Sequence, residues 1–353
     1  MRAGIDLSRA TTGIQVLHPQ VDSLSCLWRP NKPIFERRFR LEGGGAQQLQ
    51  NSPMPIVYGG KEFRCRLDTP PEPAEFPILT ELRAEGHTDY LGLPLPFSDG
   101  TWKAVTYCTR APGGFSDRHI ELLRSVVSTF ARALEIQTLR RTSLTLLETY
   151  VGQIAGRRVL DGVIKRGMSE NIRAIIWMCD MRGFTDLSER LSGPELVDHI
   201  NAYFGVMTEA VGRHGGEVLK FIGDAMLAIF TLDGGPDRSA ASRALQAARD
   251  ASSLTAERNR ERTQTGQPEI RYGIALHVGE VLYGNIGGAD RLDFTVIGRA
   301  VNLVTRIESL SKSTGRDVLL SADFARICGE PVELVGTFPL KGIDRDQQVY
   351  APT

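Results

Sequence analysis

The stretch that decides the fold of this chain is residues 216–230, GEVLKFIGDAMLAIF. Two runs rich in apolar residues flank a short turn at Gly223, and glycine is the residue with which a chain reverses most easily. The pattern predicts a β-hairpin. Lys220 and Asp224 lie on either side of the turn. On their own they are equally explained as incidental charges at a solvated hairpin tip.

A second stretch, residues 172–180 (IRAIIWMCD), is a nearly continuous apolar run that predicts a buried central strand ending in Asp180. A carboxylate at this position costs desolvation energy unless something pairs with it. Residues 181–185 (MRGFT) then form a glycine-containing turn whose backbone N–H groups suit a phosphate. Asp180 could also cap the next helix. If Asp180 and Asp224 meet in one sheet, they form a site for a hard cation such as Mg²⁺, which prefers oxygen ligands and substrate phosphates.

Helices are expected around these strands. Ser192 and Glu195 have the spacing of a capping box at the start of a long amphipathic helix, which Gly215 and Gly216 end. Core packing explains the apolar face of that helix. Residues 237–262 predict a second helix with a polar face.

A second hairpin follows, with a strand at residues 271–280 and a return strand at 291–298. His277 lies in the first of these strands and is expected to be a core residue rather than a ligand. The next helix carries Asn302 and Arg306 four residues apart on one face. An amide and a guanidinium suit a ribose and a phosphate, although the pair taken alone is better explained as part of an exposed polar face.

The first 118 residues have a mixed α+β pattern. Short strands or a helix end are expected at 13–17 and 25–28, and two further strands at 90–95 and 102–109. The turn PGGFS then leads to an amphipathic helix that Ser116 can cap.

Residues 117–160 are helical in pattern, and a long helix between two domains often packs against its twin in a dimer. Residues 152–167 then predict a hinge whose basic cluster is a solvated face. Trp28 and Trp102 of the N-terminal part could line a ligand pocket, but aromatic core packing is the simpler interpretation.

Composition limits the class of protein. The 353 residues suggest two or three domains, and Lys+Arg and Asp+Glu both number 42, without the basic excess of a nucleic-acid-binding protein. The five cysteines are scattered, which is typical of reduced thiols. No apolar run is long enough to span a bilayer, and the N-terminus lacks a signal-peptide pattern. We therefore expect a soluble, cytoplasmic protein.

Three motifs together resemble the class III nucleotidyl cyclase catalytic domain: CDMRGFT (179–185), KFIGD (220–224) and DFTVIGRAVNLVTR (293–306). The resemblance covers about residues 171–352. It implies a ferredoxin-like α+β fold that works as a head-to-tail homodimer with active sites at the interface. Arg299 departs from the family, which more often has a small polar or acidic residue there.

The N-terminal part resembles a GAF-type sensor domain over residues 88–136, and a PAS-like or unrelated α+β sensor remains open. The expected organisation is a GAF-like α+β sensor at 1–136, a helical linker and hinge at 137–170, and the catalytic domain at 171–353. An unknown small-molecule or protein signal would act on the sensor.

The cyclase resemblance assigns a role to each motif residue. Two Mg²⁺ or Mn²⁺ ions would bind Asp180, Asp224 and Met181. Lys220 and Thr295 would contact the base, Asn302 would position the ribose, and Arg306 would stabilise the transition state. The substrate would also contact Gly183, Phe184 and Thr185. In the family, the two aspartates of a site come from one chain, whereas the base-reading pair, the asparagine and the arginine come from its partner. Lys220 and Asp224 would thus serve different sites.

The base-reading pair favours ATP. Adenine offers an acceptor at N1 and a donor at N6, which a lysine donor and a hydroxyl acceptor match. Guanine offers the reverse and would call for a carboxylate at Lys220, although the hydroxyl of Thr295 can also donate. The expected reaction is the conversion of ATP to 3′,5′-cyclic AMP and pyrophosphate. The alternatives are a guanylate cyclase, or a silent cyclase-like regulator, against which the complete set of site residues argues. A GGDEF-type cyclase is disfavoured because Gly-Gly-Glu at 215–217 continues into Val-Leu-Lys.

Overall fold

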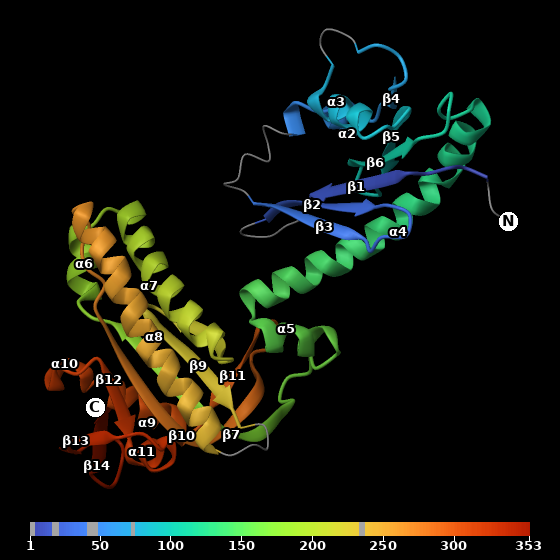
Figure 1. Ribbon diagram of the computed structural model, residues 1–353. Coiled ribbons are helices and arrows are strands. Elements are labelled where there is room, and N and C mark those ends of the chain that lie inside the picture. Colours follow the sequence, from blue (N-terminus) through green and yellow to red (C-terminus); the bar gives the residue numbers. More distant parts are fainter. Residues whose placement is uncertain (1–3, 16–20, 41–48, 72–74, 233–236) are drawn as a thin grey trace. The chain divides into compact units, whose positions relative to one another are not determined.

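The computed structural model describes residues 4–15, 21–40, 49–71, 75–232 and 237–353. The chain divides into two compact units, residues 1–146 and 147–353, each with its own sheet (Figure 1). Among the described residues, no helix is both long and apolar enough to cross a membrane.

The N-terminal unit contains a six-stranded antiparallel sheet in the order β3-β2-β1-β6-β5-β4. Its strands are β1 (Arg9–Gln15), β2 (Val21–Trp28), β3 (Phe35–Arg40), β4 (Phe63–Arg66), β5 (Asp89–Pro96) and β6 (Trp102–Thr109). The helices that begin in it are α2 (Met54–Tyr58), α3 (Pro77–Ala84) and the long α4 (Asp117–Tyr150). The apolar side chains of β5 and β6 pack against the first half of α4, which buries its apolar stripe there.

Several expectations for this unit are confirmed. The strands expected at 90–95 and 102–109 lie within β5 and β6, and residues 25–28 lie within β2. The Ser116 hydroxyl accepts a hydrogen bond from the His119 N–H at 3.3 Å and caps α4 as expected. Of the strand or helix end expected at 13–17, residues 13–15 belong to β1 and the last two lie outside the described residues. The GAF-like character of the unit stays a prediction.

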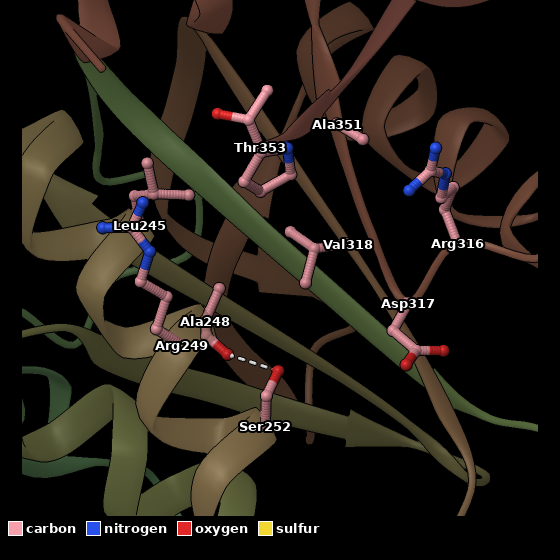
Figure 2. A pocket seen from close by; sticks show the side chains of 10 residues that line it. Leu245, Ala248, Arg249, Ser252, Arg316, Asp317, Val318, Ala351 and Thr353 are labelled. Atoms are coloured by element: carbon pink, nitrogen blue, oxygen red, sulfur yellow. Dashed lines mark hydrogen bonds between the residues drawn. The ribbon is translucent and has the colours of Figure 1, made fainter. Parts of the chain in front are cut away.

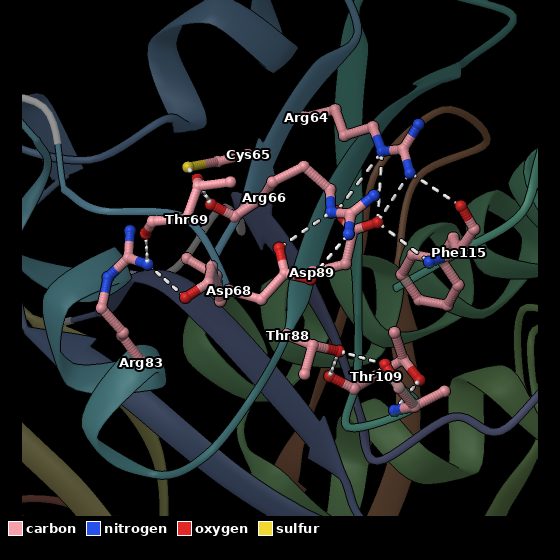
Figure 3. A network of polar contacts seen from close by, with 12 residues as sticks. Arg64, Cys65, Arg66, Asp68, Thr69, Arg83, Thr88, Asp89, Thr109 and Phe115 are labelled. Carbon is pink, nitrogen blue, oxygen red and sulfur yellow. Dashed lines mark hydrogen bonds and ion pairs between the residues drawn. The ribbon is translucent and has the colours of Figure 1, made fainter. Parts of the chain in front are cut away.

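A buried carboxylate holds the turn before α4 in place (Figure 3). Asp89, which is fully buried at the start of β5, pairs with the Arg64 guanidinium at 2.8 Å and accepts the Phe115 N–H at 2.9 Å. Arg64 also donates to the Phe115 carbonyl at 2.7 Å. Gly114 has φ 70°, and a Cβ there would lie 2.6 Å from the Asp89 carboxylate, so this close approach requires glycine.

Replacing Asp89 by alanine should destabilise the N-terminal unit by about 1–3 kcal/mol, because the buried Phe115 N–H loses its acceptor and the exposed Arg64 guanidinium loses its partner. The Asp89→Asn variant keeps an acceptor for the Phe115 N–H and should lose less stability. Hydrogen exchange of β5 and β6 under mild urea would report the opening of this unit separately from the other one. Equal protection in the wild type and both variants would contradict this role.

The second unit is organised around β7, as the apolar run predicted. The sheet order is β13-β14-β12-β10-β7-β9-β8, and β11 pairs with β10. Ile175, Trp177 and Cys179 of β7 face one core, and Ile176 and Met178 face the other. Both faces of this strand are therefore buried, which explains its lack of polar alternation.

The strands of this unit form that sheet, and helices cover both of its faces. The strands are β7 (Ser169–Met181), β8 (Glu217–Ile222), β9 (Ala225–Thr231), β10 (Tyr272–Gly287), β11 (Leu292–Ile297), β12 (Val318–Ser321), β13 (Val332–Phe338) and β14 (Gln347–Pro352). The helices are α5 (Gln153–Leu160), α6 (Phe184–Arg190), α7 (Gly193–Arg213), α8 (Asp237–Gln264), α9 (Arg299–Glu308), α10 (Ser311–Thr314) and α11 (Ala322–Cys328). Helices α7, α8 and α11 pack on one face, and α5 and α9 on the other (Figure 1).

The predicted hairpins and caps of this unit are confirmed. Strands β8 and β9 pair in antiparallel fashion around Gly223, whose φ is 65°. Ser192 and Glu195 form the expected capping box at the start of α7. His277 is buried and its Nδ1 lies 2.8 Å from the Ser321 hydroxyl, so it is a satisfied core residue.

The hinge expected at 152–167 stays a prediction, and its basic cluster is exposed, as expected, at Arg157, Lys165 and Arg166 but not at Arg158. Half of the segment is α5 (Gln153–Leu160), whose Arg158 lies over the rings of Tyr283 at 5.1 Å and Phe294 at 5.9 Å. Glu217, at the start of β8, accepts the Ala155 N–H at 3.2 Å and the Tyr283 hydroxyl at 2.8 Å. The helix is thus fixed to β8 and β10 by partners distant in the sequence.

Candidate active site

The structure brings Asp180 and Asp224 together. In the β7–β9 register Asp180 is opposite Ala225, which directly follows Asp224 in the β8–β9 turn. Both carboxylates are half-buried, and the Met181 N–H donates to Asp180 Oδ1 at 3.0 Å. Asp180 therefore lies at the strand end, as predicted. Its carboxylate accepts from the N–H of the next residue, and no side chain in the described part of the chain caps the following helix α6.

The two carboxylates concentrate negative charge at one site. Burial, followed by the negative charges of Asp224 and Glu308 and a hydrogen bond with Asp224, raises the pKa of Asp180 to about 7. Within the described residues, neither Asp180 nor Asp224 forms an ion pair with a lysine or arginine. A cation that approached this pair would meet charge that the protein itself leaves uncompensated.

Glu308 is a third carboxylate that the sequence analysis missed. It is buried at the end of α9, its Oε1 accepts the Ser311 hydroxyl at 3.2 Å, and burial raises its pKa. Gly273, opposite Asp180 in the β7–β10 register, makes room for it, because a Cβ there would lie 2.4 Å from Glu308 Oε1. The sequence did contain a signal for it. Glu308 follows Ile307 at helical spacing from Val304, so it falls on the buried face of the helix, where a charged side chain is unusual.

The expected base-reading residues lie on neighbouring strands. Lys220 is half-buried on β8, and Thr295 is buried on β11, which lies beside β8. The Thr295 hydroxyl oxygen has no hydrogen-bond partner within the described part of the chain. A buried hydroxyl without a partner is uncommon and is available to a ligand.

The asparagine and arginine of the third motif share α9. Asn302 and Arg306 are both exposed, and Arg306 forms no ion pair with any described residue. No recorded hydrogen bond joins them to the two aspartates within the same described segments. Arg299 is also exposed, at the first position of α9.

The turn after β7 has the expected shape. Gly183 has φ 77° and precedes the short helix α6, while the Arg182 N–H donates to the Arg271 carbonyl at 2.9 Å. Phe184 is half-buried against the core and Thr185 is exposed. The backbone N–H groups of the first helical turn have no partners within the helix.

A cavity of about 280 Å³ lies elsewhere in this unit, between α8, the start of β12 and the end of the chain (Figure 2). None of the predicted site residues lines it. Its two arginines are already neutralised, because Arg249 pairs with Glu330 at 2.6 Å and Arg316 with Glu333 at 2.5 Å. This cavity is therefore not the candidate active site.

Comparison with known proteins supports the motif assignment. The family model for the adenylate and guanylate cyclase catalytic domain matches residues 168–350. Adenylate cyclase of Anabaena cylindrica is 36% identical over 187 residues, which cover 53% of this chain and 36% of that protein. Adenylate cyclase 1 of Rhizobium meliloti is 30% identical over 173 residues, 48% of this chain and 26% of that protein. The chain spans about a third of the length of the first of these relatives.

One solved structure supports the fold, and a second is similar in sequence. A bacterial light-regulated adenylyl cyclase aligns over 74% of this chain and 85% of its own, with a TM-score of 0.53 and 21% identity, which speaks for the fold alone. The guanylyl cyclase Cya2 is 30% identical over 52% of this chain and 92% of its own, with a TM-score of 0.46. The family match covers more than half of the chain and contains all three motifs. The chain therefore belongs to the class III adenylate and guanylate cyclase catalytic domain family, as its motifs predict.

Proposed function

We propose that this protein is an adenylate cyclase that converts ATP to 3′,5′-cyclic AMP and pyrophosphate at the interface of a homodimer. The observation that carries the proposal is the pair formed by Asp180 and Asp224, a partly buried acidic site without a cationic partner in the described chain. A site of this kind suits a nucleotide that arrives with divalent cations.

The donor set fits Mg²⁺ or Mn²⁺. Asp180 and Asp224 would hold the ions together with the backbone carbonyl of Met181. Among the described residues, no group of three or more His, Cys, Asp or Glu side chains could hold a metal by itself, so substrate phosphates would complete the coordination. When bound, such ions neutralise phosphate charge and favour ionisation of a ribose hydroxyl.

Lys220 and Thr295 would read the base. The lysine ammonium donates to adenine N1, and the Thr295 hydroxyl, which lacks a protein partner in the described chain, accepts from the N6 amino group. Because β8 and β11 are neighbours within one chain, both residues would serve the same base. This pairing favours ATP over GTP.

Asn302 and Arg306 would act on the substrate held by the partner subunit. Their exposed positions on α9 leave the amide free to orient the ribose and the guanidinium free to meet charge that develops on the phosphoryl oxygens. Gly183, Phe184 and Thr185 would contribute the backbone N–H groups of their turn to a phosphate. The ribose 3′-oxygen attacks the α-phosphorus, and the bond to the leaving pyrophosphate breaks.

Exposed apolar side chains support a dimer. Phe221 and Ile222 follow Lys220 on β8 and are 51% and 48% exposed, and Ile297 at the end of β11 is 45% exposed. These side chains lie on the strands that carry the base-reading residues, where a partner subunit would bury them.

The direct test is product formation by the full-length protein with Mg²⁺ or Mn²⁺, supplied with ATP and GTP separately. Cyclic AMP from ATP alone is the expected result. Cyclic GMP from GTP alone would identify a guanylate cyclase. No product from either nucleotide, with a dimer present in solution, would leave two explanations: a silent regulator, or a sensor unit that holds the catalytic pair apart. The same assay on residues 165–353 alone would separate them.

Replacing Glu308 by glutamine should raise the Mg²⁺ concentration for half-maximal activity roughly tenfold, because one of the negative charges beside Asp180 is lost. The amide still accepts from Ser311, so the melting temperature should not fall. Glu257→Gln, which removes an exposed carboxylate on α8, is the matched control. An unchanged Mg²⁺ dependence in Glu308→Gln would exclude this role.

A further inference from the structure

A cavity of about 490 Å³ in the N-terminal unit is lined by residues from one end of four adjacent strands. The antiparallel registers place Arg9 opposite Cys108, Ala10 opposite Trp28 and Asp89 opposite Thr109. The residues just beyond these pairs therefore meet at one end of the sheet. They include Ser8 before β1, Arg29 after β2, His87 before β5 and Arg110 after β6.

Buried hydrogen-bonding groups form one wall of this cavity. His87 is 4% exposed, and its Nδ1 lies 2.8 Å from the Ser8 hydroxyl, which also donates to the Cys108 carbonyl at 3.0 Å. The other ring nitrogen of His87 lies 3.3 Å from the Glu85 carboxylate. Burial lowers the pKa of His87, so the permanent positive charge of the cavity comes from its arginines and lysine.

The charges that line the cavity do not balance. Its cations are Arg29, Lys32 and Arg110, and its carboxylates are Glu85 and the exposed Asp6. Glu85 already faces Arg29 at 3.7 Å, as well as Arg9 at 3.9 Å from outside the cavity. Within the described residues, Lys32 and Arg110 have no ion-pair partner. With three cations against two carboxylates the lining carries a net charge of +1, and Lys32 and Arg110 are the two cations that no carboxylate pairs with in the described chain.

We propose that this cavity binds a small anion, whose carboxylate or phosphate oxygens pair with Lys32 and Arg110. The volume is in the usual range for small-molecule pockets. Arg110 offers the planar fork of donors that matches either oxyanion, and Lys32 adds a point charge. The cavity of Figure 2 differs in this respect, because carboxylates already neutralise both of its arginines.

The test is calorimetric titration of the full-length protein with citrate and, separately, with inorganic phosphate, at constant ionic strength and without divalent cations. Saturable binding of at least one anion is expected. Tighter binding of citrate would identify carboxylates as the ligand class, and tighter binding of phosphate would identify phosphorylated ligands. Absence of saturable binding of either anion would overturn the proposal.

A pair of double variants separates this cavity from other anion sites. Lys32→Gln with Arg110→Gln should weaken binding by about tenfold or more for each cation removed. Lys61→Gln with Arg118→Gln removes the same charge from exposed positions of this unit outside the cavity and should change the affinity less than about twofold. Equal affinities of the two double variants would refute the cavity as the site. Both keep every proposed catalytic residue, so this binding result stands or falls independently of cyclase activity.

Discussion

Co-expression of Asp180→Ala and Arg306→Ala chains should restore a cyclase activity that each variant alone has lost. Each homodimer would lack either the metal-binding pair or the transition-state arginine at both sites, and should lose about a thousandfold in turnover. In the heterodimer, one site combines the intact aspartates of one chain with the intact arginine of the other. Random pairing would therefore return about a quarter of the wild-type activity.

A second pair of chains provides the matched control for this experiment. Asp180→Ala and Asp224→Ala both damage the half-site that a single chain supplies, so each site of their heterodimer still lacks one carboxylate and no recovery is expected. Recovery in this control would contradict the assignment of both aspartates to one chain. Failure of the first pair, with heterodimers verified by two affinity tags, would contradict a shared interface site. Rates of cyclic AMP formation are measured for each single variant and for both co-expressed pairs.

The substitution Lys220→Glu should reverse the nucleotide preference. A carboxylate cannot donate to adenine N1, but it accepts from the N1–H and the amino group of guanine. The ratio of kcat/KM for ATP to that for GTP should fall by about a hundredfold or more, because the mismatched base would leave polar groups unpaired in the site. Separate titrations with ATP and GTP on the dimeric protein give this ratio.

Lys220→Gln serves as the control for loss of the lysine charge alone. Its amide can both donate and accept, so ATP turnover should decrease while the preference between the two nucleotides becomes weaker rather than reversed. A preference that is the same in the wild type and in Lys220→Glu would show that another residue reads the base. In that case Thr295, whose buried hydroxyl has no partner in the described chain, would be the next position to change.

The elements that carry the predicted site could be derived from local sequence patterns. The apolar run before Asp180 and the glycine turn before Asp224 each depend on a few consecutive residues, and both elements formed as predicted. The pairing of β7 with β9 then places the two aspartates together. The roles of these residues came from the family motifs.

The features that escaped prediction depend on contacts between distant residues. Glu308 approaches Asp180 only because Gly273, more than 90 residues from that aspartate in the sequence, leaves space beside it. Arg158 looked like part of a solvated basic cluster because its partner rings, Tyr283 and Phe294, lie over 100 residues further along the chain. No local pattern encodes either contact, so only the folded structure reveals them.

The attachment of α5 has a consequence for domain exchange. Because Glu217 bonds to the Ala155 N–H and Arg158 covers Tyr283, the helix is a working part of the C-terminal unit rather than a spacer. A foreign input domain joined before Gly152 would leave these contacts whole, whereas a junction between 153 and 170 would remove them. The useful splice point for building chimeric cyclases from this chain is therefore the short break between α4 and α5.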